Sequence, residues 1–323
     1  MHTKYKNLDL GIEPTECIHN VPCRHCLSYS VLKGRGDMDF SLLEKIAGEI
    51  DEYKLKLDGV SLSGGEPLAY NYKGHNLIDI IKLFPEDSPI MIATEGAICK
   101  KYEELIKEMK SLDHMILWRF AYHNFSDRNF LDGLNKTLKL LKKLEWPIAF
   151  DEHDKGKLYF TKEIQVCAEN RDSLKYAILD LVTGLDGGDY KLKTGGKQVM
   201  LISGGDIIQL ASTVALWWGE AKKNFDIQQM SPRKIMPICP LVQKSFLGTD
   251  NRGIYRFCDP STNQDFPNLG EIKDTTIIEA FRKKEKIIGA LEKMFEQNPD
   301  LSSYGGQSCV YCEENLHRFY KGK

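Results

Sequence analysis

The most constraining feature of the sequence is a regular alternation of strand-like and helix-like apolar patterns. Strand patterns, in which apolar residues alternate with polar ones or form short apolar runs, occur at 7–15, 59–63, 89–94, 115–120, 148–150 and 198–202. Helix patterns, in which apolar residues recur on one helical face, occur at 39–56, 75–84, 102–112, 131–144 and near 171–183. Repeated strand–helix units predict an α/β fold with a parallel sheet, and about six such units favour a partial (β/α)6 TIM-like barrel.

The strand–helix alternation weakens after about residue 220. Residues 229–237 contain Pro232 and Pro237 and are typical of a linker. We therefore expect the chain to divide near residue 225, into a barrel at 1–225 and a smaller domain at 226–323.

Charge and hydropathy exclude several classes of partner. The chain has 44 basic and 46 acidic side chains and a formal net charge of -2, whereas surfaces that bind nucleic acid or anionic membranes need clustered positive charge. No apolar stretch approaches the roughly 18 residues that a membrane-spanning helix needs. The first residues do not form the apolar core of a signal peptide. We therefore expect a cytoplasmic protein with no nucleic-acid or membrane partner.

Nine cysteines in 323 residues are too few for a disulfide framework, so metal ligands are the alternative to free thiols. Three of them, close together after the first predicted strand, would suit an iron–sulfur cluster with one open iron: these are Cys17, Cys23 and Cys26. Four more would make a closed site: Cys239, Cys258, Cys309 and Cys312. The C-x2-C pairs also match zinc spacing, so spacing alone leaves both metals open. Cys99 and Cys167 lie in apolar contexts and are expected in the core.

Polar or glycine-rich turns follow the predicted strands, at the end where parallel barrels carry their chemistry. These turns are Gly64-Gly65-Glu66-Pro67, Thr94-Glu95-Gly96, Tyr122-His123-Asn124 and Asp151-Glu152-His153-Asp154. We expect them to face the same mouth as the cysteine loop.

The cysteine loop after the first strand and Gly64-Gly65-Glu66-Pro67 after the second together resemble the radical S-adenosylmethionine (radical SAM) superfamily. The resemblance implies that the three cysteines of this loop hold a [4Fe–4S] cluster whose free iron binds SAM. The spacing here is C-x5-C-x2-C in place of the family's usual C-x3-C-x2-C. The first gap of the loop is therefore longer by two residues.

The same resemblance implies roles for single residues. Glu66 would pair with the ammonium group of SAM, because a carboxylate on a Gly-Gly turn can approach a ligand closely. His25 stands just before the third cysteine, where the family usually has an aromatic residue near the adenine. The further candidates for contacts with SAM or substrate are Gly64, Gly65, Pro67, Thr94 and Arg119. A structural salt bridge is the alternative for Arg119.

The carboxyl-terminal part resembles the SPASM and Twitch extensions of radical SAM enzymes. Cys239, Gly253 and Cys258 fit their C-x9–15-G-x4-C element, and 268–281 resembles the turn and helix that follow it. Cys309 and Cys312 bring this set to four ligands, so the resemblance implies a Twitch/SPASM-like domain with one auxiliary [4Fe–4S] cluster. Separate sets of three and four cysteines in these contexts favour iron–sulfur clusters over zinc.

The function implied by the resemblance is reductive cleavage of SAM to a 5′-deoxyadenosyl radical, which abstracts hydrogen from a substrate. A flavodoxin or ferredoxin would supply the electron. The auxiliary cluster would accept an electron during a two-electron oxidation, and a general base would take a proton. The candidates for this base are Asp151, Glu152, His153, Asp154 and His123.

Three functions stay open at this point. The first is a dehydrogenase of small molecules and the second is a peptide or protein maturase. Only sixteen residues precede Cys17 and leave no room there for a separate peptide-recognition domain, which favours a small substrate or a peptide bound in the barrel. A maturase would oxidise or crosslink side chains. The third possibility is a non-catalytic iron–sulfur or zinc protein for electron transfer or regulation, and Glu66 in its Gly-Gly turn argues against it.

Overall fold

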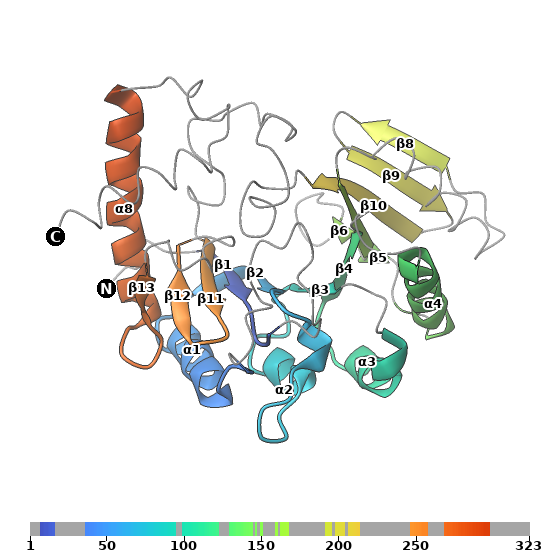
Figure 1. Cartoon of the computed structure of the whole chain (residues 1–323), viewed down its shortest axis with the longest axis horizontal. Helices are drawn as coiled ribbons and strands as arrows, with labels where there is room; N and C mark the ends of the chain where they lie inside the picture. The colour runs from blue at the N-terminus through green and yellow to red at the C-terminus, as the bar shows by residue number, and fades with distance from the viewer. Residues whose placement is uncertain are drawn as a thin grey trace. The chain divides into compact units, whose positions relative to one another are not determined.

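The computed structural model divides the chain into two compact units, Met1–Ser88 with Ala215–Lys323 and Pro89–Val214. Figure 1 labels their helices and strands. The residues that it describes are 7–16, 36–94, 99–122, 129–144, 146, 149–150, 159–160, 162–167, 191–195, 198–203, 206–213, 246–257 and 268–297. Within these ranges, no helix is both long and apolar enough to cross a membrane.

Among the described residues, the first unit contains five strands, from both ends of the chain. They are β1 (Asn7–Ile12), β2 (Lys56–Leu62), β11 (Phe246–Asp250), β12 (Ile254–Arg256) and β13 (Asn268–Glu271). Strand β1 is parallel to both β2 and β11, whereas β12 is antiparallel to β11 and to β13. The predicted strands at 7–15 and 59–63 are confirmed. The three strands from the carboxyl-terminal segment were not predicted.

The helices of the first unit follow their sequence signals. They are α1 (Phe40–Glu52), the short 3-10 helix η1 (Pro67–Ala69), α2 (Leu77–Lys82) and α8 (Ile277–Gln297). The side chain of Asp39 caps α1 by accepting from the Ser41 N–H at 3.0 Å, and Asn76 forms a capping box with Asp79 at the start of α2. The predicted helices at 39–56 and 75–84 are therefore confirmed, and α8 begins within the expected range 268–281.

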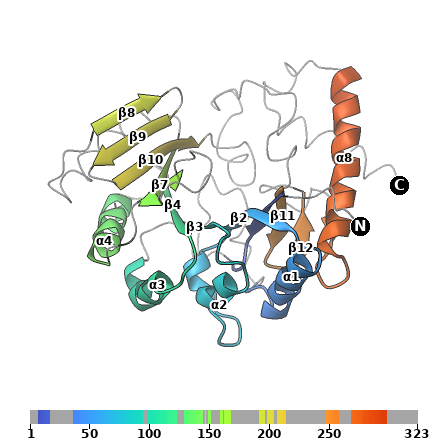
Figure 2. The same cartoon turned by 180° about the vertical axis from the view of Figure 1, so that it is seen from behind.

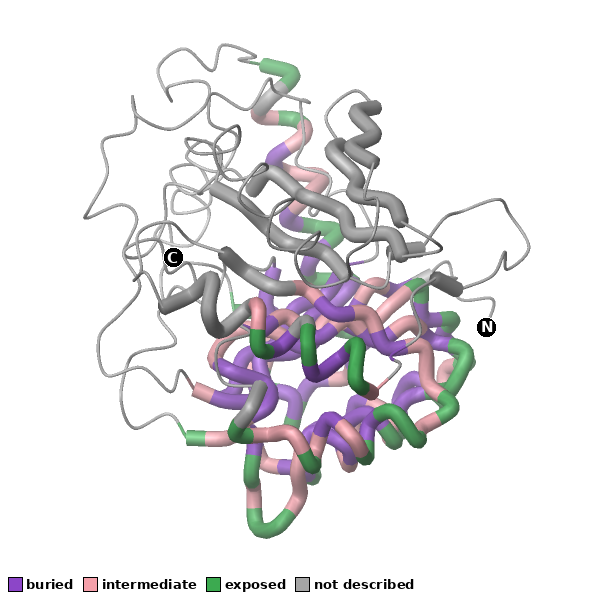
Figure 3. The backbone as a smooth tube through the Cα atoms, turned by 90° about the vertical axis from the view of Figure 1, so that its right-hand side faces the viewer, coloured by how far each residue is buried: buried purple, intermediate pink, exposed green. Residues whose placement is uncertain are grey.

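The core of the first unit forms from alternate strand residues and one face of α1. Figure 3 colours the buried residues purple along the backbone. A strand points successive side chains to opposite faces, and a helix repeats a face every three or four residues, so these two periods select the buried set. Its members include Leu8, Leu10, Ile12, Leu43, Ile46, Ile50, Val60 and Leu62.

An ion pair on α1 ties this helix to the carboxyl-terminal segment. Glu49 is buried, and its carboxylate accepts from Lys45 Nζ at 2.7 Å and from the Ile277 N–H at 2.6 Å. Lys45 Nζ also donates to the carbonyl oxygens of Ile272 and Thr275, at 2.7 and 3.2 Å. Glu49 therefore binds the first residue of α8, where a helix has backbone N–H groups without helical partners.

We expect Glu49→Ala to lower the free energy of unfolding by about 2–3 kcal/mol, because it leaves the buried Ile277 N–H without its acceptor and removes the carboxylate that pairs with the Lys45 ammonium group. Glu44→Ala is the control, since Glu44 is an exposed residue of the same helix, and it should change stability by less than about 0.5 kcal/mol. Urea denaturation of both variants measures the difference. Equal midpoints would contradict the role of Glu49.

The second unit contains a mixed sheet, whose outer strands β8, β9 and β10 lie side by side in Figure 2. Its strands are β3 (Ile90–Thr94), β4 (Ile116–Tyr122), β7 (Lys162–Cys167), β8 (Lys191–Gly195), β9 (Gln198–Ser203) and β10 (Asp206–Thr213). The strands β3, β4, β7 and β10 are parallel in this order, and β9 and β8 follow antiparallel. Its helices are η2 (Cys99–Tyr102), α3 (Glu103–Lys110) and α4 (Asn129–Lys143).

Two expected barrel strands differ from the prediction. The strand expected at 148–150 is β5 (Ala149–Phe150), which pairs antiparallel with β6 (Tyr159–Phe160) in a separate sheet, while β7 lies beside β4. The strand expected at 198–202 is antiparallel to both neighbours, because the Gly-Gly pairs at 195–196 and 204–205 allow tight hairpins. The fold is thus a mixed α/β sheet. The helix expected near 171–183 and the boundary near 225 lie outside the described residues.

Candidate functional site

Both ends of the cysteine loop meet at the carboxyl end of β1. The Met38 N–H donates to the Pro14 carbonyl at 2.8 Å, and the Gly36 N–H donates to Glu16 Oε2 at 3.0 Å. The Thr15 hydroxyl donates to the Asp37 carboxylate. Residues 14–16 and 36–38 therefore form a closed base for the segment 17–35, which lies outside the described residues.

The Gly64-Gly65 turn after β2 lies directly against this base. The Ser63 N–H donates to the Ile12 carbonyl at 2.9 Å. Gly64 has φ +98°, and a Cβ there would clash with the side chain of Glu13. A Cβ on Gly65 would clash with the carbonyl oxygens of Thr15 and Glu16. Both positions therefore require glycine, and the turn contacts the residue that immediately precedes Cys17.

The carboxylate of Glu66 is held in a fixed orientation at the end of this turn. Its side chain is only 4% exposed, and Oε1 accepts from the Leu68 N–H at 3.3 Å as the cap of η1. Pro67 occupies the first position of η1, where its missing N–H costs no hydrogen bond. Glu13, 7% exposed, is a second buried carboxylate at this turn. Two buried carboxylates at one turn suit a cationic group such as an ammonium.

The segment after η1 is tied to the same base. The Asn71 N–H donates to Asp37 Oδ2 at 3.0 Å, and the Tyr70 hydroxyl donates to the Met38 carbonyl at 2.9 Å. Burial, reinforced by the negative charges of Asp37 and Asp39, raises the pKa of Tyr70 well above its usual value. The hydroxyl of Tyr70 therefore stays a donor. One carboxylate oxygen of Asp37 binds Thr15 of the cysteine-loop base, and the other binds Asn71 in the segment after η1.

Thr94 and Arg119 belong to the second unit, where the register places them on opposite faces of the sheet. Thr94 is the last residue of β3, is buried, and pairs with Phe120. Arg119 pairs with Ala93 on one side and with Glu163 on the other. Since paired residues share a face and neighbours in a strand alternate, Thr94 and Arg119 cannot line the same face.

The other expected site residues lie outside the described residues. They are Cys17, Cys23, His25, Cys26, His123, Asp151, Glu152, His153, Asp154, Cys239, Cys258, Cys309 and Cys312. The described ranges alone contain no group of three or more His, Cys, Asp or Glu side chains that could hold a metal ion. Cys99 and Cys167 lie in η2 and β7, and their core positions stay predictions.

Two glycines of the Twitch-like pattern have physical reasons to be glycine. Gly253 lies in the turn between β11 and β12 with φ +74°, and a Cβ there would clash with Leu42 of α1. Gly270 has φ +136°, and a Cβ there would clash with Thr275. Both backbone conformations are strained for any residue with a side chain.

Sequence reasoning missed the polar residues that close the cysteine loop. Glu16 and Asp37 lie within two residues of the segment 17–35, one on each side of it. Their polar side chains next to a buried strand were a signal in the sequence that could have identified them. Asn251, whose side chain donates to the Gly36 carbonyl at 2.7 Å, had no signal because it is 215 residues away in sequence.

The fold of this chain is similar to that of anSMEcpe, a protein that binds AdoMet. Solved structures that match this chain include three of anSMEcpe: the native protein with bound AdoMet and Cp18Cys peptide (TM-score 0.53, 12% identity), with bound AdoMet (0.54, 14%), and with bound AdoMet and Kp18Cys peptide (0.51, 15%). Each match covers 85% of this chain and 80% of that chain. No family model and no curated protein sequence matches the chain.

Proposed function

We propose that this chain is a radical SAM enzyme, which cleaves SAM reductively and uses the 5′-deoxyadenosyl radical to abstract hydrogen from a substrate. The observation that carries the proposal is the contact of the Gly64-Gly65-Glu66 turn with Thr15 and Glu16, at the start of the cysteine loop. The two motifs of the family resemblance are 37 to 49 residues apart in sequence (Cys26 to Ser63, Cys17 to Glu66). In the fold, the Gly64-Gly65 turn contacts Thr15 and Glu16, the residues just before Cys17.

The residues at this contact fit the group that the proposal requires. Cys17, Cys23 and Cys26 would hold a [4Fe–4S] cluster, which when bound supplies the electron for SAM cleavage. Gly64 and Gly65 leave room for close approach of a ligand to the backbone. Glu66, oriented by the Leu68 N–H, would pair with the ammonium group of SAM.

We extend the proposal to the architecture and to a second cluster. Residues 1–225 would form the partial barrel, and 226–323 would form the Twitch/SPASM-like domain with an auxiliary [4Fe–4S] cluster on four thiolates. Those ligands would be Cys239, Cys258, Cys309 and Cys312. The glycine-requiring conformations of Gly253 and Gly270 support this assignment. A reducing compartment such as the cytoplasm keeps such thiols available to metals.

For the substrate, we propose a peptide or protein side chain, oxidised by two electrons with the auxiliary cluster as acceptor. The support is that two of the matching anSMEcpe structures hold a bound peptide. A flavodoxin or ferredoxin would be the reductant. His123, Asp151, Glu152 and His153 remain the candidates for the base that takes the proton.

The substrate class is tested by comparing two pools of compounds in one assay. The reconstituted chain is given SAM and dithionite with either a pool of peptides of about 20 residues or a pool of small alcohols and sugars. A peptide substrate predicts that only the peptide pool raises 5′-deoxyadenosine formation above the rate without substrate. Stimulation by the small-molecule pool alone would contradict the peptide proposal and favour the dehydrogenase.

The role of Glu66 predicts a specific defect in SAM binding. We expect Glu66→Gln to weaken SAM binding about tenfold or more, because the neutral amide loses the charge-assisted bond to the ammonium group. The iron content should stay at the wild-type level. Glu86→Gln is the control, since Glu86 is an exposed residue of the same unit. Equal SAM affinity in both variants would contradict the proposed role.

A further inference from the structure

The strand that leads into the cysteine loop is held along one edge by the carboxyl-terminal segment. Strands β1 and β11 are paired in parallel from Asp9 with Phe246 to Ile12 with Thr249. The Glu13 N–H donates to the Thr249 carbonyl at 3.1 Å, one residue beyond the paired strand. This edge contact stops four residues before Cys17.

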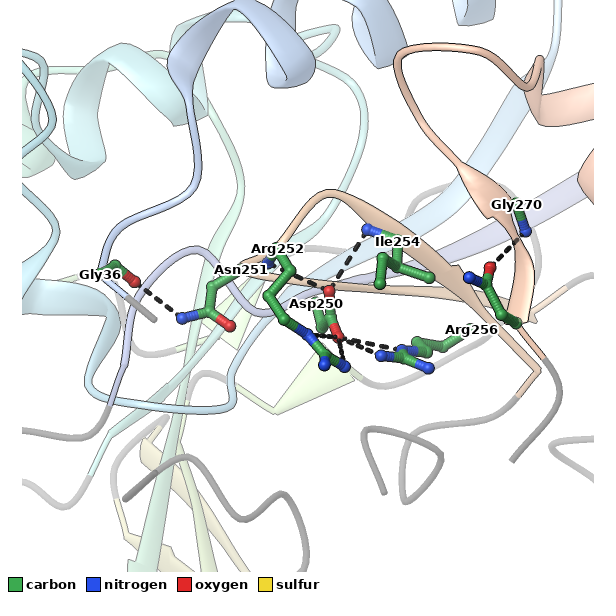
Figure 4. Close-up of polar contacts among 8 residues, drawn as sticks. Gly36, Asp250, Asn251, Arg252, Ile254, Arg256 and Gly270 are labelled. Carbon is green, nitrogen blue, oxygen red and sulfur yellow. Dashed lines mark hydrogen bonds and ion pairs between the residues drawn. The ribbon is translucent and has the colours of Figure 1, made fainter. Parts of the chain in front are cut away.

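The turn after β11 reaches the other end of the cysteine loop. Asn251 is 6% exposed, and its Nδ2 donates to the Gly36 carbonyl at 2.7 Å (Figure 4). The N–H of the same Gly36 donates to Glu16 Oε2 at 3.0 Å. Gly36, the first described residue after the loop, is therefore held at its N–H by the amino-terminal segment and at its carbonyl by the carboxyl-terminal segment.

A buried carboxylate fixes the turn that carries Asn251. Asp250 is fully buried and accepts from the Arg252 and Ile254 N–H groups at 3.1 and 3.3 Å, and from the guanidinium groups of Arg252 and Arg256 (Figure 4). Arg256 is itself buried and ends β12, two residues before Cys258. One hairpin therefore contacts the base of the first cysteine loop and leads into a cysteine of the second set.

We propose that Asn251 is a positioning residue for the SAM-cluster loop, supplied to it by the carboxyl-terminal segment. The inference rests on the proposed function for the role of the loop, although the anchorage of Gly36 is independent of it. Without the Asn251 amide, the Gly36 carbonyl loses its buried donor. The contacts that then remain at residues 36–38, within the described part of the chain, come from residues 14–16 and 70–71. The loop geometry, and with it the site for SAM, should then loosen.

The test compares amide hydrogen exchange and SAM binding in matched asparagine variants of the full chain. Asn251→Ala should speed exchange of the segment 17–36 by about three- to tenfold, the effect of losing one buried hydrogen bond. It should weaken SAM binding by a similar factor and alter the electron paramagnetic resonance of the reduced SAM cluster, while the signal of the auxiliary cluster stays unchanged. Asn251→Asp keeps the shape of the side chain, loses the donor and should behave like the alanine variant.

The control is Asn268→Ala. Asn268 is an exposed asparagine of the same carboxyl-terminal segment, and it accepts from the Gly270 N–H at 2.7 Å. The Asn268→Ala variant should leave the amide hydrogen exchange of residues 17–36 and the affinity for SAM at the wild-type level. Equal exchange in all variants would overturn the role of Asn251. A wild-type chain that neither binds iron nor cleaves SAM would overturn the proposed function instead, and the exchange of the iron-free chain would still decide whether Asn251 anchors the loop.

Discussion

Replacing Cys17, Cys23 and Cys26 together by alanine should abolish SAM cleavage and lower the iron content from about eight to about four per chain. The three thiolates would be the protein ligands of the cluster that binds SAM, and no cysteine of the second set could replace them without opening its own site. Iron analysis and 5′-deoxyadenosine formation under dithionite measure the two effects.

The matched variant is the double replacement Cys309→Ala and Cys312→Ala. It should also lose about four irons, but from the auxiliary cluster, so cleavage of SAM persists while turnover of the substrate falls. The opposite pattern, in which only the second set is needed for SAM cleavage, would reverse the assigned roles of the two sets.

The second large effect is expected at Gly65. Gly65→Ala places a methyl group against the carbonyl oxygens of Thr15 and Glu16, which are backbone atoms and cannot rotate away. The residues before Cys17 must therefore shift, and a displacement of about 1 Å at an active site can lower a rate about a hundredfold. We expect SAM cleavage to fall by about this factor, measured as 5′-deoxyadenosine formed per minute.

Gly48→Ala is the control for Gly65→Ala. Gly48 lies in α1 with open space around its Cα, so alanine there should stabilise the chain by about 0.5–1 kcal/mol and leave SAM cleavage intact. The iron signal of the auxiliary cluster reports whether the Gly65 variant is folded. A folded Gly65→Ala variant with wild-type SAM cleavage would contradict the contact between the turn and the loop base.

The helices and strands that the sequence predicted correctly are those whose apolar residues recur at a regular spacing. The helix α1 and the strands β1, β2, β3 and β4 have apolar residues spaced for burial on one side, and their caps and turns are local signals. Strand β7 alternates apolar Ile164 and Val166 with Glu163 and Gln165 over few residues, and it was missed. The hairpins of β8, β9 and β10 were also missed, although Gly-Gly pairs stand between these strands.

The candidate site likewise contains residues that a local sequence motif identifies and residues that it does not. Glu66 and its glycines are close in sequence, so a local motif identified them, and the clash at Gly65 gives the motif a physical reason. The residues that close the loop base depend on pairing between distant segments. Asn251 reaches Gly36 only because β11 pairs with β1, and no local pattern contains that pairing.

Formation of 5′-deoxyadenosine by the wild-type chain, after anaerobic reconstitution with iron and sulfide, tests whether the protein cleaves SAM reductively. With SAM and dithionite, we expect 5′-deoxyadenosine and methionine in equal amounts from a chain that holds about eight irons. A chain that instead holds zinc and leaves SAM intact would contradict the proposed function.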